Sequence, residues 1–191
     1  MAILVTGGAG FIGSHFVVDW IREGRADVVN LDALTYAGSL ENLATIEGEA
    51  RHRFVRGDVR DRDLLANLFE THRPEAVVHF AAETHVDRSI AAHDRFVESN
   101  VVGTARLIDA AVVYWRDSPA EFRDRFRFVQ VSTDEVFGTL GPDDPPFREA
   151  DPFRPNNPYA ATKAGADHLV RAAFRTHGLP VVTTHGTNTF G

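Results

Sequence analysis

The segment AILVTGGAGFIG, residues 2–13, carries the strongest fold signal in the chain. Its first five residues form an apolar run without a polar face, which is typical of a strand buried inside a parallel sheet. Gly7, Gly10 and Gly13 then permit a tight turn and let backbone N–H groups and the start of a helix approach a pyrophosphate closely. The segment therefore predicts the strand, loop and helix of a dinucleotide-binding unit.

A second strand is predicted at residues 28–31, and it ends in Asp32, nineteen residues beyond Gly13. A carboxylate at this place can accept hydrogen bonds from an adenosine ribose, although a solvated acid at a strand end is the plainer alternative. Because the same carboxylate would repel a 2′-phosphate, the sequence favours NAD over NADP as cofactor.

The rest of the chain alternates between strand and helix patterns. Strands are predicted at residues 53–55, 76–80 and 126–132. Helices are predicted at residues 61–71, along an apolar stripe from Val97 to Trp115, and from Pro158 onward. The predicted loops are residues 38–48, 117–125 and 141–157. This rhythm predicts one α/β domain over residues 1–191, a doubly wound parallel sheet of the Rossmann type. Ligands bind beyond the carboxyl ends of such strands, where Gly7, Asp32, Asp58, Ala81 and Thr133 fall.

Composition limits the classes of function. The net charge of −7 argues against nucleic-acid binding, and no apolar run approaches membrane-spanning length. The chain has no cysteine, and its nine histidines are scattered, so no metal site is expected. These features predict a cytoplasmic protein without a membrane anchor.

Chemistry-bearing residues gather at the end of the last predicted strand and on the helix after it. Asp134 and Glu135 follow that strand directly, and Tyr159 and Lys163 lie four residues apart, on one helix face. An ammonium beside a phenol favours the phenolate, so Lys163 is expected to lower the pKa of Tyr159. The set predicts redox chemistry coupled to elimination, whereas a plain surface pair is the alternative for Tyr159 and Lys163.

Five segments together resemble the extended short-chain dehydrogenase/reductase superfamily and, within it, the dTDP-glucose 4,6-dehydratases. They are TGGAGFIGS at 6–14, DALTYAG at 32–38, HFAAETHVDRSI at 79–90, STDEVFG at 132–138 and PYAATKAGADHLV at 158–170. The glycines and the Tyr-x-x-x-Lys pair are shared by the superfamily, including epimerases and decarboxylases. The Thr-Asp-Glu run is specific to the dehydratases.

The resemblance implies a reaction and assigns its residues. Tyr159 would deprotonate the 4-hydroxyl of dTDP-glucose during hydride transfer to NAD, with Thr133 bonding the reacting oxygen and Lys163 holding the nicotinamide ribose. Glu135 would then remove the C5 proton while a protonated Asp134 releases the 6-hydroxyl as water. Adjacent strand residues normally point to opposite faces, so the resemblance also implies an irregular strand end at this point.

The resemblance implies further ligand contacts and a homodimer. It places Asp58 and Val59 beside the adenine, and Thr84 and Asn188 on the substrate. The other cofactor contacts that it implies are Gly7, Gly10, Phe11, Ile12, Gly13, Asp32, Leu34, Thr35, Ala81, Ala82, Asn100, Tyr159 and Lys163. Near the C-terminal end the chain departs from the family run TNCSNNYG, since it reads THGTNTFG at 184–191, with histidine at 185 and threonine at 189.

Family members continue beyond the point at which this chain stops, into a region that supplies much of the nucleotide-sugar pocket. That region is expected to be absent here. Two alternatives therefore stand beside a competent dehydratase: a truncated NAD-binding module without turnover, and another nucleotide-sugar epimerase or decarboxylase. The second must explain why both Asp134 and Glu135 are present, since 4-epimerisation needs neither.

Overall fold

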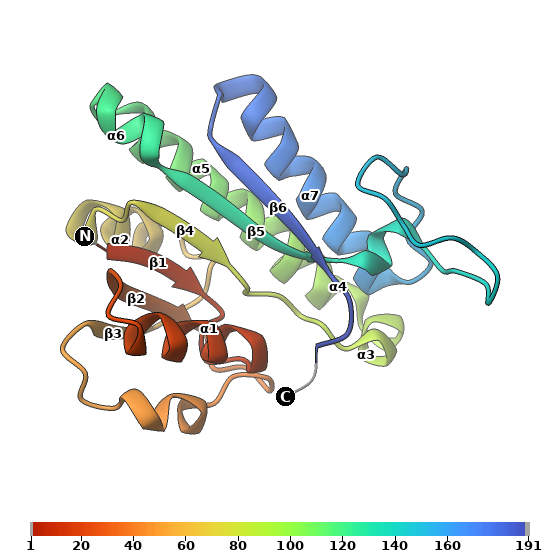
Figure 1. Ribbon diagram of the computed structural model, residues 1–191, viewed down its shortest axis with the longest axis horizontal. Coiled ribbons are helices and arrows are strands. Elements are labelled where there is room, and N and C mark those ends of the chain that lie inside the picture. Colours follow the sequence, from red (N-terminus) through yellow and green to blue (C-terminus); the bar gives the residue numbers. More distant parts are fainter. Residues whose placement is uncertain (1, 190–191) are drawn as a thin grey trace.

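The protein, described here by a computed structural model over residues 2–189, is built on one sheet of six parallel strands (Figure 1). The strands are β1 (Ala2–Thr6), β2 (Asp27–Asp32), β3 (His52–Arg56), β4 (Ala76–His79), β5 (Arg127–Thr133) and β6 (Val181–Gly186). Their order across the sheet is β3-β2-β1-β4-β5-β6, which confirms the predicted doubly wound Rossmann sheet. The chain changes direction across the sheet between β1 and β4, and a ligand crevice is expected there.

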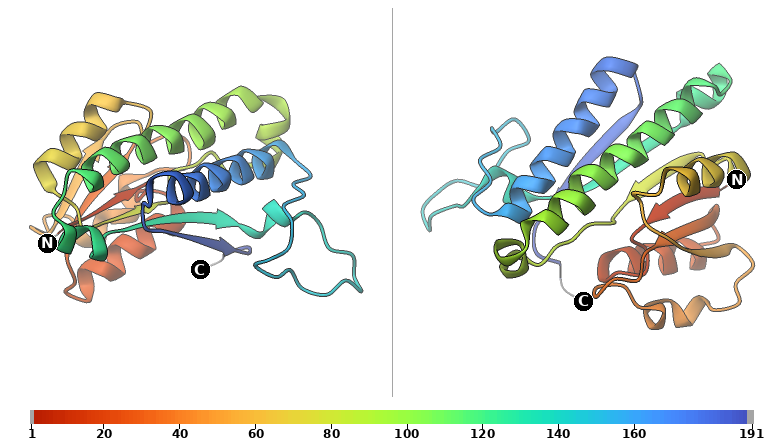
Figure 2. Two further views of the ribbon diagram at one scale, coloured as in Figure 1. Left: turned by 90° about the horizontal axis from the view of Figure 1, so that it is seen from above. Right: turned by 180° about the vertical axis from the view of Figure 1, so that it is seen from behind.

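Helices cover the sheet in two layers (Figure 2). One face carries α2 (Arg62–His72), α5 (Thr104–Arg116) and α7 (Pro158–His177), and the larger apolar core, which includes Leu4, Val77 and Phe128, lies beneath them. The other face carries α1 (Phe11–Arg22) and η1 (Leu40–Ile46), which pack over Ile3 and Val28. Apolar side chains on both sides of β1 explain why this strand shows no polar face in the sequence.

Two predicted loops contain helices, and one strand was not predicted. Residues 40–46 form η1, whose start is capped by the Ser39 side chain, and Ala120–Arg125 form α6 after Pro119. Strand β6 pairs along β5 in parallel. Its four β-branched residues, Val181 to Thr184, were the available sign of a strand.

The helix predicted along the stripe from Val97 to Trp115 is present, but its first half is a π-type helix and shorter helices precede it. The chain forms α3 (Val86–Ala91), α4 (His93–Phe96) and then η2 (Val97–Gly103), a wider π-type helix that leads into α5. The wider turn shifts the helix face, so Val97 is 44% exposed while Asn100 is buried. A polar side chain thus takes the interior position that the apolar stripe had assigned to valine.

Gly7 makes the turn after β1 possible. Its φ is +74°, and a Cβ at this position would lie 2.5 Å from the backbone nitrogen of Ala81, at the end of β4. Any side chain would therefore meet both a strained backbone and a fixed neighbour. The glycine brings β1 and β4 together where the crevice opens.

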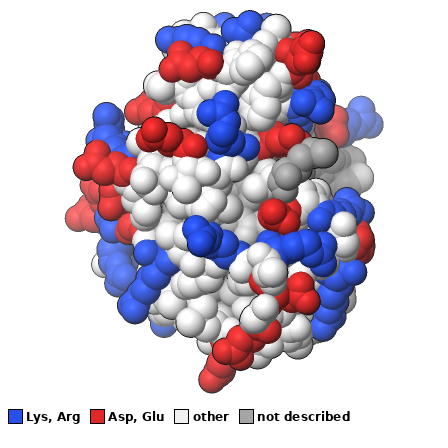
Figure 3. Space-filling view, turned by 90° about the vertical axis from the view of Figure 1, so that its left-hand side faces the viewer, with Lys and Arg blue, Asp and Glu red and all other residues white. Residues whose placement is uncertain are grey.

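The surface seen in Figure 3 carries both signs of charge. Basic and acidic side chains alternate around an uncharged area, and this face has no continuous basic patch of the kind that tracks a phosphate backbone. Within residues 2–189, none of the helices combines the length and the apolar character that crossing a membrane requires.

His79 links both halves of the sheet to the helix layer. Its Nδ1 lies 2.6 Å from the Thr6 hydroxyl of β1, and its Nε2 lies 2.9 Å from the Thr104 hydroxyl at the start of α5. Complete burial, with Lys163 as a minor cause, lowers the pKa of His79 to about 3, so the ring is neutral in the folded protein.

This neutral ring predicts a loss of stability in mild acid. In the unfolded chain His79 takes up a proton near pH 6.5, whereas the folded chain resists protonation to about pH 3, so stability falls as the pH drops through this window. Between pH 7 and 5 this group alone should cost about 2 kcal/mol. Urea unfolding at pH 7 and pH 5 measures the difference in the free energy of unfolding between the two pH values. This difference should be smaller in His79→Gln than in the wild type, and the exposed control His93→Gln should leave it unchanged. Equal pH dependence in the wild type and His79→Gln would contradict the assignment.

Candidate active site

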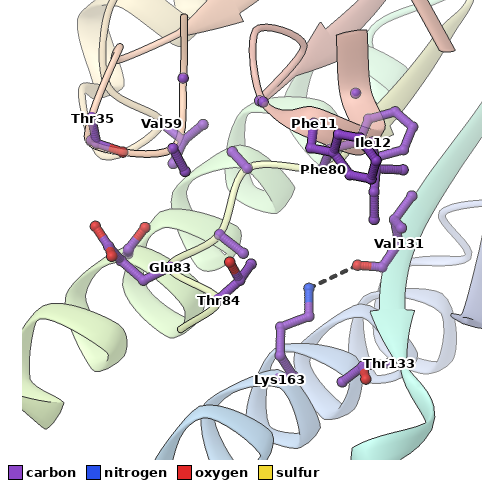
Figure 4. A pocket seen from close by; sticks show the side chains of 18 of the residues that line it. Phe11, Ile12, Thr35, Val59, Phe80, Glu83, Thr84, Val131, Thr133 and Lys163 are labelled. Carbon is purple, nitrogen blue, oxygen red and sulfur yellow. Dashed lines mark hydrogen bonds between the residues drawn. The ribbon is translucent and has the colours of Figure 1, made fainter. Parts of the chain in front are cut away.

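A pocket of about 820 Å³ opens at the carboxyl ends of β1, β2, β4, β5 and β6, across the point where the strand order reverses. Figure 4 shows Lys163 and Thr133 on one side of it, and Phe11 and Ile12 of α1 on another. Most of the residues that the sequence singled out line this pocket, namely Gly7, Gly10, Phe11, Ile12, Gly13, Asp32, Thr35, Asp58, Val59, Ala81, Ala82, Thr84, Thr133, Glu135, Tyr159, Lys163 and Asn188.

At one end of the pocket, backbone N–H groups fix Asp32. Its Oδ2 accepts a hydrogen bond from Ala9 N–H at 2.9 Å and its Oδ1 accepts one from Leu34 N–H at 2.8 Å. Each carboxylate oxygen keeps a further lone pair, so Asp32 can still accept bonds from a ribose diol. Nearby, Arg60 binds Asp58 through Nη2 at 2.7 Å, and this hydrogen bond lowers the pKa of Asp58.

Three of the predicted site residues do not line the main pocket. Leu34 packs with the core under α1, and its N–H is used by Asp32. Asn100 was predicted to line the cofactor channel, but it is 1% exposed, and its amide binds the backbone of Glu83 and the Thr162 hydroxyl. Its position is structural, because the π-type turn of η2 points it inward.

Asp134 is the third predicted site residue that does not line the main pocket. It lines a smaller hollow of about 360 Å³ together with Glu135, Asn157 and Asn188. Glu135 and Asn188 line both spaces, so the two hollows meet at these residues. Asp134 and Glu135 therefore border adjoining spaces, and of the two only Glu135 lines the main pocket.

The strand end is irregular, as the resemblance implied. β5 ends at Thr133, and Asp134–Phe137 turn into η3, a short 3₁₀ helix. The Thr133 hydroxyl accepts a hydrogen bond from Glu135 N–H at 3.3 Å, which holds the start of this turn. The alternation of a strand is broken here, so neighbouring side chains are no longer bound to point to opposite faces.

Asn157 connects this turn to the helix that carries Tyr159. Its Oδ1 accepts a hydrogen bond from Ala160 N–H at 2.8 Å and so caps α7, as predicted. Its Nδ2 donates to Glu135 Oε2, also at 2.8 Å. One amide thereby fixes both the start of α7 and the direction of the Glu135 carboxylate.

Burial dominates the electrostatics of Tyr159 and Lys163. Desolvation and the Glu135 carboxylate raise the pKa of Tyr159 to about 12, against a smaller lowering by a hydrogen bond with Thr133. The expected lowering by Lys163 was therefore wrong for the protein by itself. Burial also lowers the pKa of Lys163 to about 8, and its Nζ donates to the Val131 carbonyl at 2.7 Å.

Sequence reasoning missed a buried polar group next to Lys163. The Asp167 carboxylate lies one helical turn further along α7, in contact with Ser132 of β5 and His185 of β6. The four-residue spacing from Tyr159 through Lys163 to Asp167 was the available sign. Among residues 2–189, no group of histidine, aspartate and glutamate side chains is arranged to hold a metal ion.

The parallel sheet, the glycine-rich turn and the Tyr-x-x-x-Lys helix define an extended short-chain dehydrogenase/reductase. Within that superfamily, a family model described as GDP-mannose 4,6 dehydratase matches residues 4–191, and the chain belongs to this family.

Relatives and solved structures agree with this placement. A dTDP-glucose 4,6-dehydratase of Xanthomonas campestris pv. campestris is 55% identical over 188 residues, which are 98% of this chain and 53% of the relative. One from Neisseria meningitidis serogroup B is 51% identical over 99% of this chain and 53% of its own length. The chain thus spans about half the length of these relatives.

The fold matches crystal structures of similar enzymes. A dTDP-glucose 4,6-dehydratase from Streptomyces venezuelae with NAD and TYD bound has a TM-score of 0.86 at 48% identity, over 97% of this chain and 55% of that one. A UDP-glucose 4-epimerase from Thermus thermophilus in complex with NAD has a TM-score of 0.82 at 33% identity, over 97% of this chain and 54% of that one.

Proposed function

We propose that this chain binds NAD across the β1–β4 switch point and carries the catalytic groups of a dTDP-glucose 4,6-dehydratase. In this proposal the pyrophosphate lies on the turn from Gly7 to Gly13, at the start of α1, and the adenosine ribose on Asp32. The adenine lies beside Asp58 and Val59, and the nicotinamide lies at the Tyr159 end. The fit of this pocket to NAD is supported by Asp32, which lines the pocket and whose carboxylate is fixed by two backbone N–H groups while keeping lone pairs for a ribose diol.

NAD supplies a hydride acceptor for C4 of the sugar and later a hydride donor for C6. Tyr159 removes the proton of the 4-hydroxyl, and Thr133 hydrogen-bonds the same oxygen. Because the pKa of Tyr159 is about 12 in the protein alone, the phenol needs positive charge beside it to act near neutral pH. Charged Lys163 and a cationic nicotinamide ring are suited to supply that charge.

The elimination step uses the two carboxyl groups. Oxidation at C4 acidifies the C5 proton, which Glu135 removes, while Asp134 protonates the leaving 6-hydroxyl. Their placement in adjoining hollows suits this division, because the two reactions take place at different carbons of one sugar. Asn157 orients Glu135 through its amide N–H.

The observation that carries the proposal is Glu135, which lines both hollows and acts electrostatically on Tyr159. A 4-epimerase needs a phenol at C4, but its reaction gives the Glu135 carboxylate no role. The substrate, dTDP-glucose, and a homodimeric assembly are part of the proposal, and similarity to the named dehydratases supports the substrate.

Cofactor choice tests the role of Asp32. NAD⁺ should bind at least about tenfold more tightly than NADP⁺, because a like-charge contact with the 2′-phosphate costs more than about 1.4 kcal/mol. Asp32→Ala should narrow this preference in calorimetric titrations, and Asp27→Ala, at the exposed start of the same strand, should not. Equal affinities of the unaltered chain for both cofactors would refute the assignment.

Oxidation and elimination can be separated in a form extended to the length of its relatives. Tyr159→Phe should suppress NADH formation and every later step. Glu135→Gln should still oxidise C4 but slow the exchange of the C5 proton. We expect NADH formation in Tyr159→Phe and C5 exchange in Glu135→Gln each to fall by about 10²- to 10⁴-fold, the range of general acid–base catalysis. Rapid-quench analysis in deuterated water measures both, with Glu41→Gln on exposed η1 as control. Normal deuterium incorporation at C5 by Glu135→Gln would remove Glu135 from the role of base.

The 191-residue chain alone should bind NAD but produce little or no 4-keto sugar. Most of the predicted NAD contacts line one pocket, whereas the sugar nucleotide is left with Thr84, Asn188 and the residues from Thr133 to Glu135. On β6, Val182 is 46% exposed, so apolar sheet surface remains available for packing. The assay is 4-keto-sugar formation from dTDP-glucose. Turnover comparable with a full-length relative would show that no further chain is needed.

A further inference from the structure

Tyr159, Lys163 and Asp167 form a row along one face of α7. They are spaced by four residues, so each side chain lies one turn from the next. All three are buried: Tyr159 is 8% exposed, Lys163 4% and Asp167 5%. The proposed reaction uses the phenol and the ammonium but gives the carboxylate no part.

One oxygen of the Asp167 carboxyl group is held by a hydrogen bond, and the other is buried without one. Its Oδ2 accepts a hydrogen bond from the Ser132 hydroxyl at 2.6 Å. The same oxygen lies 3.3 Å from His185 Nε2, which is ion-pair distance but without the alignment of a hydrogen bond. Its Oδ1 is buried and has no hydrogen-bond partner in the described part of the chain. A buried carboxylate with an unpaired oxygen is costly, so a nearby positive charge would offset the cost.

Lys163 is the nearby cation, and it is the single lysine of the chain. The titratable groups of the surrounding elements are Tyr159 and Asp167 on α7, His79 on β4, Glu135 on η3 and His185 on β6. His79 is neutral above about pH 3. Burial lowers the pKa of Lys163 to about 8, and Asp167 is the group whose charge raises it again.

We propose that Asp167 is a positioning residue that acts through Lys163: its carboxylate, one turn further along α7, helps to keep the buried ammonium charged beside the Val131 carbonyl. Without this carboxylate, burial would lower the pKa of Lys163 further, so a smaller share of the amine would be charged near neutral pH. The phenol would then lose part of the positive charge that it requires. The inference rests on the proposed function, since that function gives the ammonium its task, but its test does not require turnover.

The test is to titrate Lys163 directly. Lysine labelled with ¹³C at Cε gives one side-chain resonance in this chain, whose shift with pH reports the ionisation of Lys163. We expect a midpoint near pH 8 in the wild type. In Asp167→Asn the midpoint should fall measurably below that of the wild type, as expected on loss of a buried opposite charge. Asp167→Ser provides a second removal of the charge if the first variant does not fold.

Ser132→Ala is the matched control, because it removes the hydrogen bond from the Ser132 hydroxyl but keeps the carboxyl group of Asp167. It should shift the midpoint by clearly less than Asp167→Asn. The surface variant Asp109→Asn, on α5, should not shift it. A Lys163 midpoint that is unchanged in folded Asp167→Asn, or moved equally by Ser132→Ala, would overturn the proposal. Neither result would bear on whether the chain binds NAD or dehydrates a sugar, so the two proposals fail separately.

Discussion

The two hydrogen bonds of the Asn157 side chain join the turn after β5 to the start of α7, at the end of the pocket that holds Tyr159. The amide oxygen caps α7, and the amide nitrogen binds Glu135, which sits in the turn after β5. The position of Tyr159, two residues into the helix, is thereby linked to that of the carboxylate that faces it. Ser89 adds a second link, because its hydroxyl accepts a hydrogen bond from Tyr159 N–H at 3.2 Å. The relative placement of phenol and carboxylate is thus set by backbone and amide contacts, before any ligand binds.

Burial gives these groups their chemical character. The phenol and the ammonium both lie in low-dielectric surroundings that oppose their charged forms, which raises the pKa of Tyr159 and lowers that of Lys163. The charged forms of these groups are therefore favoured mainly when an opposite charge lies close by. A cation that binds in the pocket shifts the ionisation of Tyr159 towards the phenolate. This arrangement suits a proton transfer that takes place together with hydride transfer.

Much of this fold follows from local pattern. The apolar run of β1 favours a buried strand, Gly7 permits the left-handed turn after it, and Asn157 before Pro158 favours the start of a helix, so the sheet and the start of α7 were predictable. Tertiary contacts decide the rest: η2 widens to bury Asn100, and Asp134, in η3, lines a separate hollow. The pKa of Tyr159 also depends on burial, which residue spacing alone does not reveal. Asp167 was missed because its partners, Ser132 and His185, come from strands that pair only in the folded sheet.

The central claim is that Lys163 lies at the nicotinamide end of an extended dinucleotide site. It can be tested on the ¹³C-labelled chain by adding NAD⁺ or ADP, which share the adenosine diphosphate part but differ in the nicotinamide riboside. The account predicts that saturating NAD⁺ shifts the Lys163 resonance and that saturating ADP leaves it in place. An equal shift with ADP, or no shift with bound NAD⁺, would contradict the orientation of the cofactor and with it the assignment of Tyr159 as the base at C4.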